Sequence, residues 1–328
     1  MSQPVTLQQA AVFLCGAQDV FILTHKAPDG DTLGSGFALM HALRQLGKRA
    51  AVLCNDPIPA RFAYLDPHPD EQSFLPQTVV TVDVADTTLL GDKLQSYADQ
   101  IDLSIDHHGS NTGFAEKLLL RADAAANCEL VLDLIEAMGV ALTPQIADCL
   151  YTGLATDTGC FRHTSTTADS HRAAEKLIQA GADLRSIHRR LFESESRGKI
   201  ALTVAALQSL RYELGGRCAT MVLMRDCINQ NGVTDDELEG ISALPRQIEG
   251  VQVGVTLRQY KSYCGYKVSV RTDGKADASA ICGRLGGGGH CGAAGCTFEI
   301  TDLDEVYRQV LDSVRQELEQ QEKLDASL

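Results

Sequence analysis

Residues 20–31 read VFILTHKAPDGD, and this stretch sets the pattern of the first half of the chain. Its four leading apolar residues predict a short buried strand. His25, Asp29 and Asp31 follow within eight residues of that run. Apolar residues then recur at helical spacing and predict a helix over residues 32–46. A strand that leads through a polar loop into a helix is the repeating element of an α/β fold.

The alternation of strand and helix patterns continues over the first 180 residues. Further strands are predicted at residues 49–54, 78–82 and 101–105. Helices are predicted at residues 89–97, 129–138, 144–156 and 169–180. The sequence therefore predicts a mostly parallel sheet with helices on both faces.

The second half of the chain has a different pattern. Residues 184–214 predict one long, polar-rich helix that connects two domains. Beyond it, strands are predicted at residues 218–225, 251–259, 266–272 and 297–300, and helices at residues 234–244, 276–285 and 302–328. We therefore divide the chain into an N-terminal α/β domain (1–184), a helical linker (185–212) and a smaller α+β domain (213–328), and expect the active site in the cleft between the domains.

Composition restricts the class of protein. Of the 328 residues 44% are hydrophobic, which is enough for a substantial core. The eleven cysteines form no CxxC pair, which favours reduced thiols, and the absence of a long apolar span argues against the membrane. We expect a cytoplasmic protein. The net charge of −14 opposes binding to long duplex nucleic acid but leaves a small anionic substrate compatible with bound metal ions.

Aspartate and histidine side chains follow several predicted strands and one predicted helix. The candidate metal ligands are His25, Asp29, Asp31, Asp83, His107 and Asp157. The carboxyl ends of parallel strands share one edge of a sheet, which is where open α/β folds bind their ligands. Six ligands of this type suit two divalent ions, with Mn²⁺ preferred over thiolate-binding metals. Two such ions are typical of phosphate-ester hydrolysis.

Taken singly, some of these residues can also be explained by a purely structural role. The loop around His25 could be solvated and only cap the next helix, with Asp31 as the N-cap residue, and Asp83 could also be only a cap. Asp106-His107-His108 at a strand end is harder to explain as a structural feature, because a buried pair of imidazoles needs polar partners.

A glycine-rich stretch, GRLGGGGHCGAAG over residues 283–295, is the second strong signal. Consecutive glycines, including Gly288 and Gly289, let backbone amides approach an anion, and His290 adds an imidazole at their edge. We interpret this stretch as a loop that binds an anion or a base rather than as a flexible linker. Arg271 could hold a phosphate or could simply be an exposed arginine.

Taken together, these motifs resemble the DHH phosphoesterase superfamily. HKAPDGD, VTVDVAD, SIDHHGS and LATDTG are similar to its four metal motifs, and VSVRT with GGGGHCGAAG resembles the C-terminal domain of its exonuclease branch. The chain is most similar to the stand-alone oligoribonucleases (nanoRNases) and phosphoadenosine phosphate phosphatases. Family II pyrophosphatases share the four motifs but lack the GGGGH stretch.

The resemblance implies a role for each candidate residue. His25 and Asp29 would bind one ion, Asp31, His107 and Asp157 the other, and Asp83 both. His108 would contact the scissile phosphate, and Asp106 would orient the ligands. Arg271, Gly288, Gly289 and His290 would bind the far end of the substrate. Asn127, Cys128 and Cys160 stand where relatives often have small hydroxyl residues, and we expect them to border the substrate.

The sequence thus predicts a Mn²⁺-dependent, two-metal phosphohydrolase. Its expected substrates are very short oligonucleotides or phosphoadenosine phosphate; a cyclic dinucleotide phosphodiesterase or a single-strand-specific exonuclease is the alternative. A nucleotide-binding module without chemistry and a structural protein with an acidic sheet edge are rival hypotheses. The sequence is also compatible with a homodimer.

Overall fold

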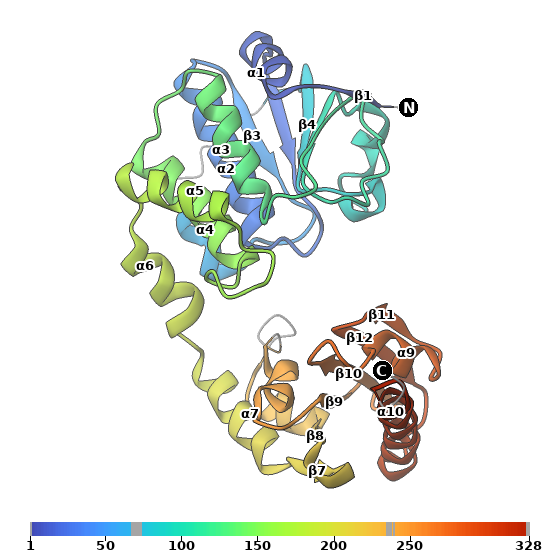
Figure 1. Ribbon diagram of the computed structural model, residues 1–328. Helices are drawn as coiled ribbons and strands as arrows, with labels where there is room; N and C mark the ends of the chain where they lie inside the picture. Colours follow the sequence, from blue (N-terminus) through green and yellow to red (C-terminus); the bar gives the residue numbers. More distant parts are fainter. Residues whose placement is uncertain (1, 67–73, 234–237, 239, 326–328) are drawn as a thin grey trace. The chain divides into compact units, whose positions relative to one another are not determined.

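The chain folds into two compact units, which are described separately. Unit 1 is Met1–Ser194 and unit 2 is Glu195–Leu328. The computed structural model describes residues 2–66, 74–233, 238 and 240–325 (Figure 1). Among the described helices, none combines the length and the apolar character that crossing a membrane requires.

Unit 1 is built on a six-stranded sheet with the order β1-β6-β5-β4-β2-β3, in which all neighbouring strands are parallel. The strands are β1 (Gln3–Pro4), β2 (Val20–Leu23), β3 (Ala50–Leu53), β4 (Thr78–Val82), β5 (Leu103–Asp106) and β6 (Lys117–Leu120). This confirms the predicted α/β fold class and the four predicted strands. β1 and β6 were not predicted, because one has two residues and the other lies between charged residues without a clear alternation.

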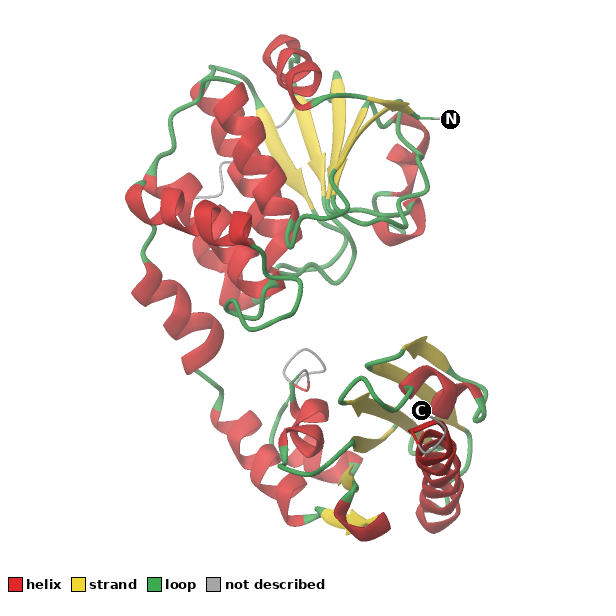
Figure 2. Cartoon of the chain, in the orientation of Figure 1, coloured by secondary structure: helices red, strands yellow, loops and turns green. Residues whose placement is uncertain are grey.

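The two faces of this sheet are covered differently. Val20 and Ile22 of β2 belong to a core with the long helices, whereas Phe21 and Leu23 pack with residues of the short 3-10 helices. Figure 2 shows the long α-helices gathered on one face of the sheet. The helices of unit 1 are α1 (Leu7–Gly16), α2 (Gly30–Gln45), α3 (Asn127–Ala137), α4 (Pro144–Asp157), α5 (Ala168–Gln179) and α6 (Leu184–His188), with the 3-10 helices η1 (Ala60–Leu65), η2 (Thr87–Leu90) and η3 (Gln95–Gln100) and the π-helix η4 (Arg189–Glu193).

Two helix predictions were wrong. Residues 89–97 form no α-helix, because Gly91 adopts a left-handed backbone with a φ of 74° between η2 and η3. Residues 184–214 do not form one continuous helix either. Ser194 is extended, and the hydroxyl of Ser196 accepts a hydrogen bond from the backbone N–H of Lys199 as the N-cap of a new helix. Serine is a favoured N-cap residue, so this sequence ends one helix and begins another.

Unit 2 contains a mixed six-stranded sheet with the order β11-β12-β10-β9-β8-β7, in which only the β8–β9 pair is parallel. The strands are β7 (Arg211–Glu213), β8 (Cys218–Leu223), β9 (Val253–Gln259), β10 (Tyr266–Thr272), β11 (Gly288–His290) and β12 (Ala293–Phe298). Its described helices are α7 (Arg197–Gln208), α8 (Arg225–Gln230), α9 (Ala278–Gly283) and α10 (Leu303–Asp325), with the 3-10 helices η5 (Leu214–Gly216) and η7 (Ile241–Gln247).

One hydrophobic core of unit 2 lies between the sheet and α10, and a second one includes residues of α7 and β8. Alternate residues of β10, Val268 and Val270, pack with Val306, Val310 and Val314, which recur at helical spacing on α10. The predicted strands at β8, β9 and β10 are confirmed. Residues 234–237 and 239 of the helix predicted at 234–244 lie outside the described residues, and its end is part of η7.

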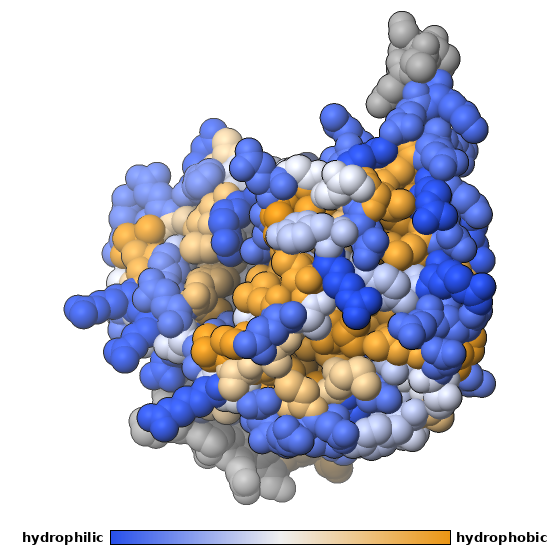
Figure 3. All heavy atoms as spheres, turned by 90° about the horizontal axis from the view of Figure 1, so that it is seen from below, coloured by the Kyte–Doolittle hydropathy of each residue, from blue (hydrophilic) through white to orange (hydrophobic). Residues whose placement is uncertain are grey.

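Unit 2 also exposes apolar side chains. The face seen in Figure 3 carries a hydrophobic region bordered by polar residues. Large hydrophobic residues of unit 2 that are at least 40% exposed include Val204, Leu207, Tyr212 and Met224. The surface of this unit is therefore not uniformly polar, in spite of the net charge of −14.

Candidate metal centre at the carboxyl edge of the parallel sheet

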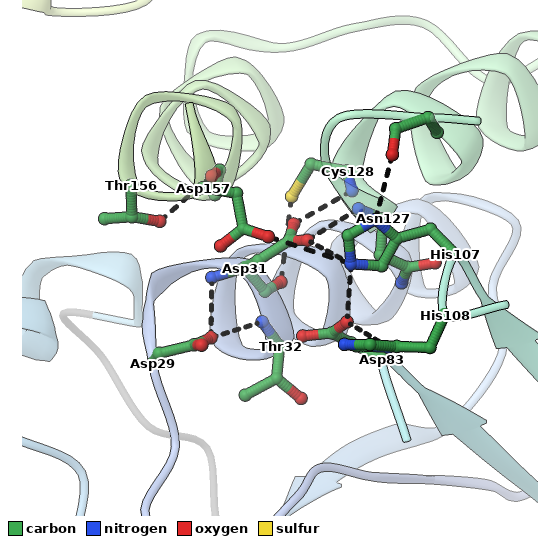
Figure 4. Close-up of polar contacts among 12 residues, drawn as sticks. Asp29, Asp31, Thr32, Asp83, His107, His108, Asn127, Cys128, Thr156 and Asp157 are labelled. Atoms are coloured by element: carbon green, nitrogen blue, oxygen red, sulfur yellow. Dashed lines mark hydrogen bonds and ion pairs between the residues drawn. The ribbon is translucent and has the colours of Figure 1, made fainter. Parts of the chain in front are cut away.

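The six predicted metal ligands lie together in unit 1, at the ends of β2, β4 and β5 and at the ends of two helices. Figure 4 shows five of them, Asp29, Asp31, Asp83, His107 and Asp157. Parallel strands bring their carboxyl ends to one edge, which explains why residues far apart in sequence meet here. Three groups of ligand atoms lie within 4.8 Å of one another: His25, Asp29 and Asp83; Asp31, His107 and Asp157; and Asp83, His107 and His108.

Asp83 is the member that faces both halves of this cluster. Its Oδ2 lies 3.7 Å from Nε2 of His25, and its Oδ1 lies 3.3 Å from Nε2 of His107. The residue directly follows β4 and has a φ of 59°, a left-handed conformation that is uncommon outside glycine. Such strain persists where the surroundings enforce it, and it is frequent at functional sites.

Both histidines are oriented by the backbone. Nδ1 of His25 lies 2.8 Å from the carbonyl oxygen of Lys26, and Nδ1 of His107 lies 3.1 Å from that of Ala124. When Nδ1 donates to a carbonyl, Nε2 is left to face the carboxylates. This is the usual arrangement of a metal-binding imidazole, whose second nitrogen is fixed by a hydrogen bond.

The carboxylates of the cluster are poorly compensated without a cation. Burial, reinforced by the neighbouring carboxylates, raises the pKa of Asp31 to about 7 and that of Asp157 to about 9. Asp157 also ends α4, where the helix dipole disfavours negative charge. Burial would also raise the pKa of Asp83, but the imidazoles of His25 and His107 hold it below its ordinary value.

The pKa values of the two histidines are raised by the carboxylates and not by burial. Burial alone would lower their pKa values, yet the adjacent carboxylates raise the pKa of His25 to about 11 and that of His107 to about 10. Among the described buried atoms, Oδ1 of Asp83 and Nε2 of His107 form no well-oriented hydrogen bond, although they lie 3.3 Å apart. Because buried polar atoms normally have partners, these two atoms and their acidic surroundings fit a site for divalent cations.

In unit 2, Arg271 and His290 lie in one row of the sheet. Arg271 on β10 and His290 on β11 are both opposite Ala293 of β12, which runs between them. Residues directly opposite on antiparallel strands point to the same face, so the two basic side chains share a face of this sheet. Gly288 and Gly289 belong to β11 itself, so part of the predicted loop is an edge strand and the residues on either side of it are turns.

Comparison with known proteins agrees with this geometry. Residues 19–154 match the model of the DHH family, N-terminal domain, and residues 215–320 match that of the DHHA1 domain. The bifunctional oligoribonuclease and PAP phosphatase NrnA of Thermus thermophilus is 36% identical over 306 residues, which cover 91% of this chain and 90% of that protein. The chain belongs to the DHH family.

Solved structures of similar fold extend the comparison. An exopolyphosphatase-related protein from Bacteroides fragilis matches with a TM-score of 0.83 at 22% identity and covers 97% of this chain and 96% of its own. RecJ in complex with Mn²⁺, from Thermus thermophilus, matches with a TM-score of 0.55 at 14% identity over 94% of this chain and 55% of RecJ. At these identities the likeness concerns the fold.

The aspartate of the DHH triplet, Asp106, is buried and accepts several hydrogen bonds. Oδ1 of Asp106 accepts hydrogen bonds from the backbone N–H groups of His107 and His108 and lies 2.8 Å from Nδ1 of His108. Its Oδ2 accepts a hydrogen bond of 2.7 Å from Asn111. The contact with Asp106 raises the pKa of His108, whose side chain is 43% exposed. Asp106 therefore fixes the ring of His108 and favours its protonated form.

Asp31 is held by the first residues of α3. Its Oδ2 accepts from the backbone N–H of Asn127 at 2.5 Å and its Oδ1 from that of Cys128 at 2.9 Å. Both residues are buried, at 0% and 1% exposure, so the expectation that they border the substrate was wrong. The N-cap prediction also needs correction, because Asp29 rather than Asp31 caps α2 by accepting from the N–H groups of Asp31 and Thr32.

Gly153 completes the surroundings of Asp31, and sequence reasoning missed it. A Cβ atom at this position of α4 would meet Sγ of Cys128 and would lie 2.7 Å from Oδ1 and 2.9 Å from Cα of Asp31. A glycine within a helix usually reflects such a packing requirement, and that was the signal available in the sequence. The third departure, Cys160, is half-buried, with Sγ 3.9 Å from Nε2 of His188.

Proposed function

We propose that this chain is a Mn²⁺-dependent, two-metal phosphohydrolase. Its substrates would be very short oligonucleotides, which it degrades to mononucleotides, and phosphoadenosine phosphate, from which it removes a phosphate. The observation that carries this proposal is the buried carboxylate of Asp83 between the imidazoles of His25 and His107. It occurs in a chain 36% identical to a relative named for both activities.

The ligand atoms suggest how two ions would be held. Asp83 would serve both ions, because its two oxygens face different histidines. The remaining ligands divide into His25 with Asp29 for one ion and Asp31, His107 and Asp157 for the other, in keeping with the groups of atoms within 4.8 Å. Bound divalent ions supply a water of lowered pKa and positive charge for the phosphoryl oxygens.

His108 would act on the substrate rather than on a metal ion. Its Nδ1 is the atom near Asp83, at 3.6 Å, but that nitrogen is engaged by Asp106 at 2.8 Å. Asp106 raises the pKa of His108 and so favours the imidazolium, in which Nε2 as well as Nδ1 carries a proton. His108 can therefore donate a hydrogen bond from Nε2 to a phosphoryl oxygen, where negative charge increases in the transition state.

Arg271, Gly288, Gly289 and His290 would bind another part of the substrate. Arg271 and His290 point to the same face of their sheet, and a guanidinium can hold two phosphate oxygens at once. The glycines belong to an edge strand, which leaves backbone groups available to a ligand. These contacts would favour nucleotides over simple phosphate esters.

A comparison of substrates tests the proposed activity. The Mn²⁺-loaded protein should hydrolyse an RNA dinucleotide or phosphoadenosine phosphate at least about tenfold faster than a cyclic dinucleotide or a 20-nucleotide single-stranded DNA, measured as kcat/KM. Protein stripped of metal by chelation is the control and should be inactive until Mn²⁺ is returned. If the protein prefers the cyclic dinucleotide or the long strand, the proposed substrate is wrong. Full activity after chelation would exclude a metal mechanism.

Replacing His290 with alanine tests the role of unit 2. If His290 holds the substrate, its loss should raise KM for a dinucleotide about tenfold and change kcat little, because loss of uniform binding appears in KM. Bis(p-nitrophenyl) phosphate is the control substrate, since it has no second nucleotide to hold, and its hydrolysis should be unchanged. Equal slowing of both substrates, or loss of bound metal, would place His290 in the catalytic centre instead.

A further inference from the structure

Unit 1 contains a basic cavity that the proposed mechanism does not use. Among the described residues, its wall includes the four arginines Arg61, Arg185, Arg189 and Arg190, serine hydroxyls and one carboxylate, Asp183. Its volume of about 490 Å³ is within the range of small-ligand sites. Four guanidinium groups around one cavity contrast with the net charge of −14 of the chain. We refer to it as the arginine pocket.

The arginines on α6 and η4 are available to a ligand. The carboxylate of Asp183 already accepts the backbone N–H of Ser186 as the N-cap of α6. In the described part of the chain, neither Arg185 nor Arg189 forms an ion pair with a carboxylate. The two are four residues apart and therefore project from neighbouring positions of the helical segment. Arg189 opens the π-helix η4, a type of turn that is frequent at functional sites.

Arg190 adds a flat surface to this wall. Its guanidinium carbon lies 5.2 Å from the centre of the Tyr64 ring, and its Nε donates to the hydroxyl of Ser186 at 3.3 Å. A guanidinium held over an aromatic ring offers a plane on which a nucleobase can stack. The combination of arginine forks with such a plane is characteristic of sites for single-stranded nucleic acid.

The arginine pocket is connected to the metal centre through α4. The hydroxyl of Tyr64 lies 2.6 Å from that of Thr152, which is five residues before Asp157 on the same helix. Five residues of α-helix advance by about 7.5 Å. The pocket and the metal centre therefore lie along the same helix, and a nucleotide chain that extends beyond the cleaved bond would have to follow it to reach the arginines.

We propose that the arginine pocket binds the phosphodiester backbone of oligonucleotide substrates longer than a dinucleotide. This inference rests on the proposed function and deepens it, because it assigns a site for the part of the substrate that is not being cleaved. Arginine binds phosphate oxygens in pairs, and four of them suit a chain with several phosphates better than a single free phosphate. A dinucleotide would be too short to use the pocket.

The double variant Arg185→Ala/Arg189→Ala tests the proposal. With Mn²⁺-loaded protein, KM for an RNA pentanucleotide should rise about tenfold, while kcat and KM for a dinucleotide should stay within about twofold. For binding to a single strand, each lost phosphate contact also lowers the slope of log K against log salt concentration by about 0.7. The magnitude of this slope should therefore fall by about 1.4 in the double variant. The single variants Arg185→Gln and Arg189→Gln should each give part of the effect.

A matched variant on α5, Arg172→Ala/Lys176→Ala, removes the same charge from surface ion pairs with Asp169 and Glu136. It should leave both substrates unaffected. Equal losses on both substrates, a similar loss in the α5 variant, or no change in the pocket variant would overturn the proposal. Tighter binding of an acidic peptide than of the pentanucleotide would also overturn it.

Equilibrium binding separates this proposal from the proposed function. A fluorescent pentanucleotide with phosphorothioate linkages should bind the wild-type, Mn²⁺-loaded protein about tenfold more tightly than the pocket variant. If the wild-type protein binds this probe through the arginines but cleaves no oligonucleotide, the proposed function fails and the pocket assignment stands. If the wild-type protein cleaves dinucleotides but both proteins bind the probe equally, the pocket assignment fails and the proposed function stands.

Discussion

Replacing Asp83 with asparagine is expected to abolish almost all turnover, by about 10²–10³-fold or more, because the variant loses a charge that would serve both ions of the proposed two-metal site. Asparagine keeps the shape of the side chain and tolerates the left-handed backbone at this position, where φ is 59°. Loss of activity would therefore report the missing charge rather than a distorted turn. Metal content, measured by mass spectrometry, should fall from about two ions per chain, the stoichiometry of a two-metal site.

Asp86 offers a matched control for this experiment. It lies three residues further on and caps η2 by accepting a hydrogen bond from the N–H of Thr88. Asp86→Asn should keep both the metal content and the activity. If Asp83→Asn also retains two ions, Asp83 is a structural residue and the two-metal assignment is wrong.

Replacing Gly153 with alanine is expected to weaken Mn²⁺ binding by about 10–100-fold, the usual cost of disturbing residues that support a metal ligand. The added Cβ would lie 2.7 Å from Oδ1 of Asp31 and 2.9 Å from its Cα, so this proposed ligand would have to move. Alanine favours a helix over glycine by about 1 kcal/mol, and a loss of binding would therefore not reflect a weaker α4. Titration calorimetry with Mn²⁺ measures the change without reference to turnover.

Gly16→Ala is the control for this substitution. Gly16 ends α1, and a Cβ there would meet no atom within 4 Å. This variant should bind Mn²⁺ as the wild-type protein does. Normal Mn²⁺ binding by Gly153→Ala would show that the position of Asp31 does not depend on the close packing of α4 against it.

The sequence predicted well those features that depend on the order of residues along one strand. A polar residue after a short apolar run, such as His25 after β2 or Asp83 after β4, lies at the carboxyl edge of a parallel sheet whatever the rest of the fold does. The same holds for Asp157, whose place at the end of a helix was predicted and is confirmed. The ligand assignment itself stays a prediction.

What the sequence could not reveal depends on backbone groups and on packing between distant elements. The N–H groups of Asn127 and Cys128 that hold Asp31 belong to the backbone, so the side chains at these positions gave no sign of their function. The choice of Asp29 over Asp31 as the N-cap depends on which carboxylate α3 and α4 bury. The bend at Gly91 likewise depends on a backbone conformation that a helical hydrophobic pattern does not encode.

The raised pKa values of the cluster have a consequence for how the protein exchanges its ions. Without metal, His25, His107 and Asp157 hold protons at neutral pH, since their pKa values are about 11, 10 and 9. In the proposed metal site, an incoming Mn²⁺ would displace such protons, so loading should acidify an unbuffered solution and should weaken as the pH falls. The displaced protons can return when the ions leave. The proposed centre would thus exchange protons for metal ions, and we expect chelation to be reversible rather than denaturing.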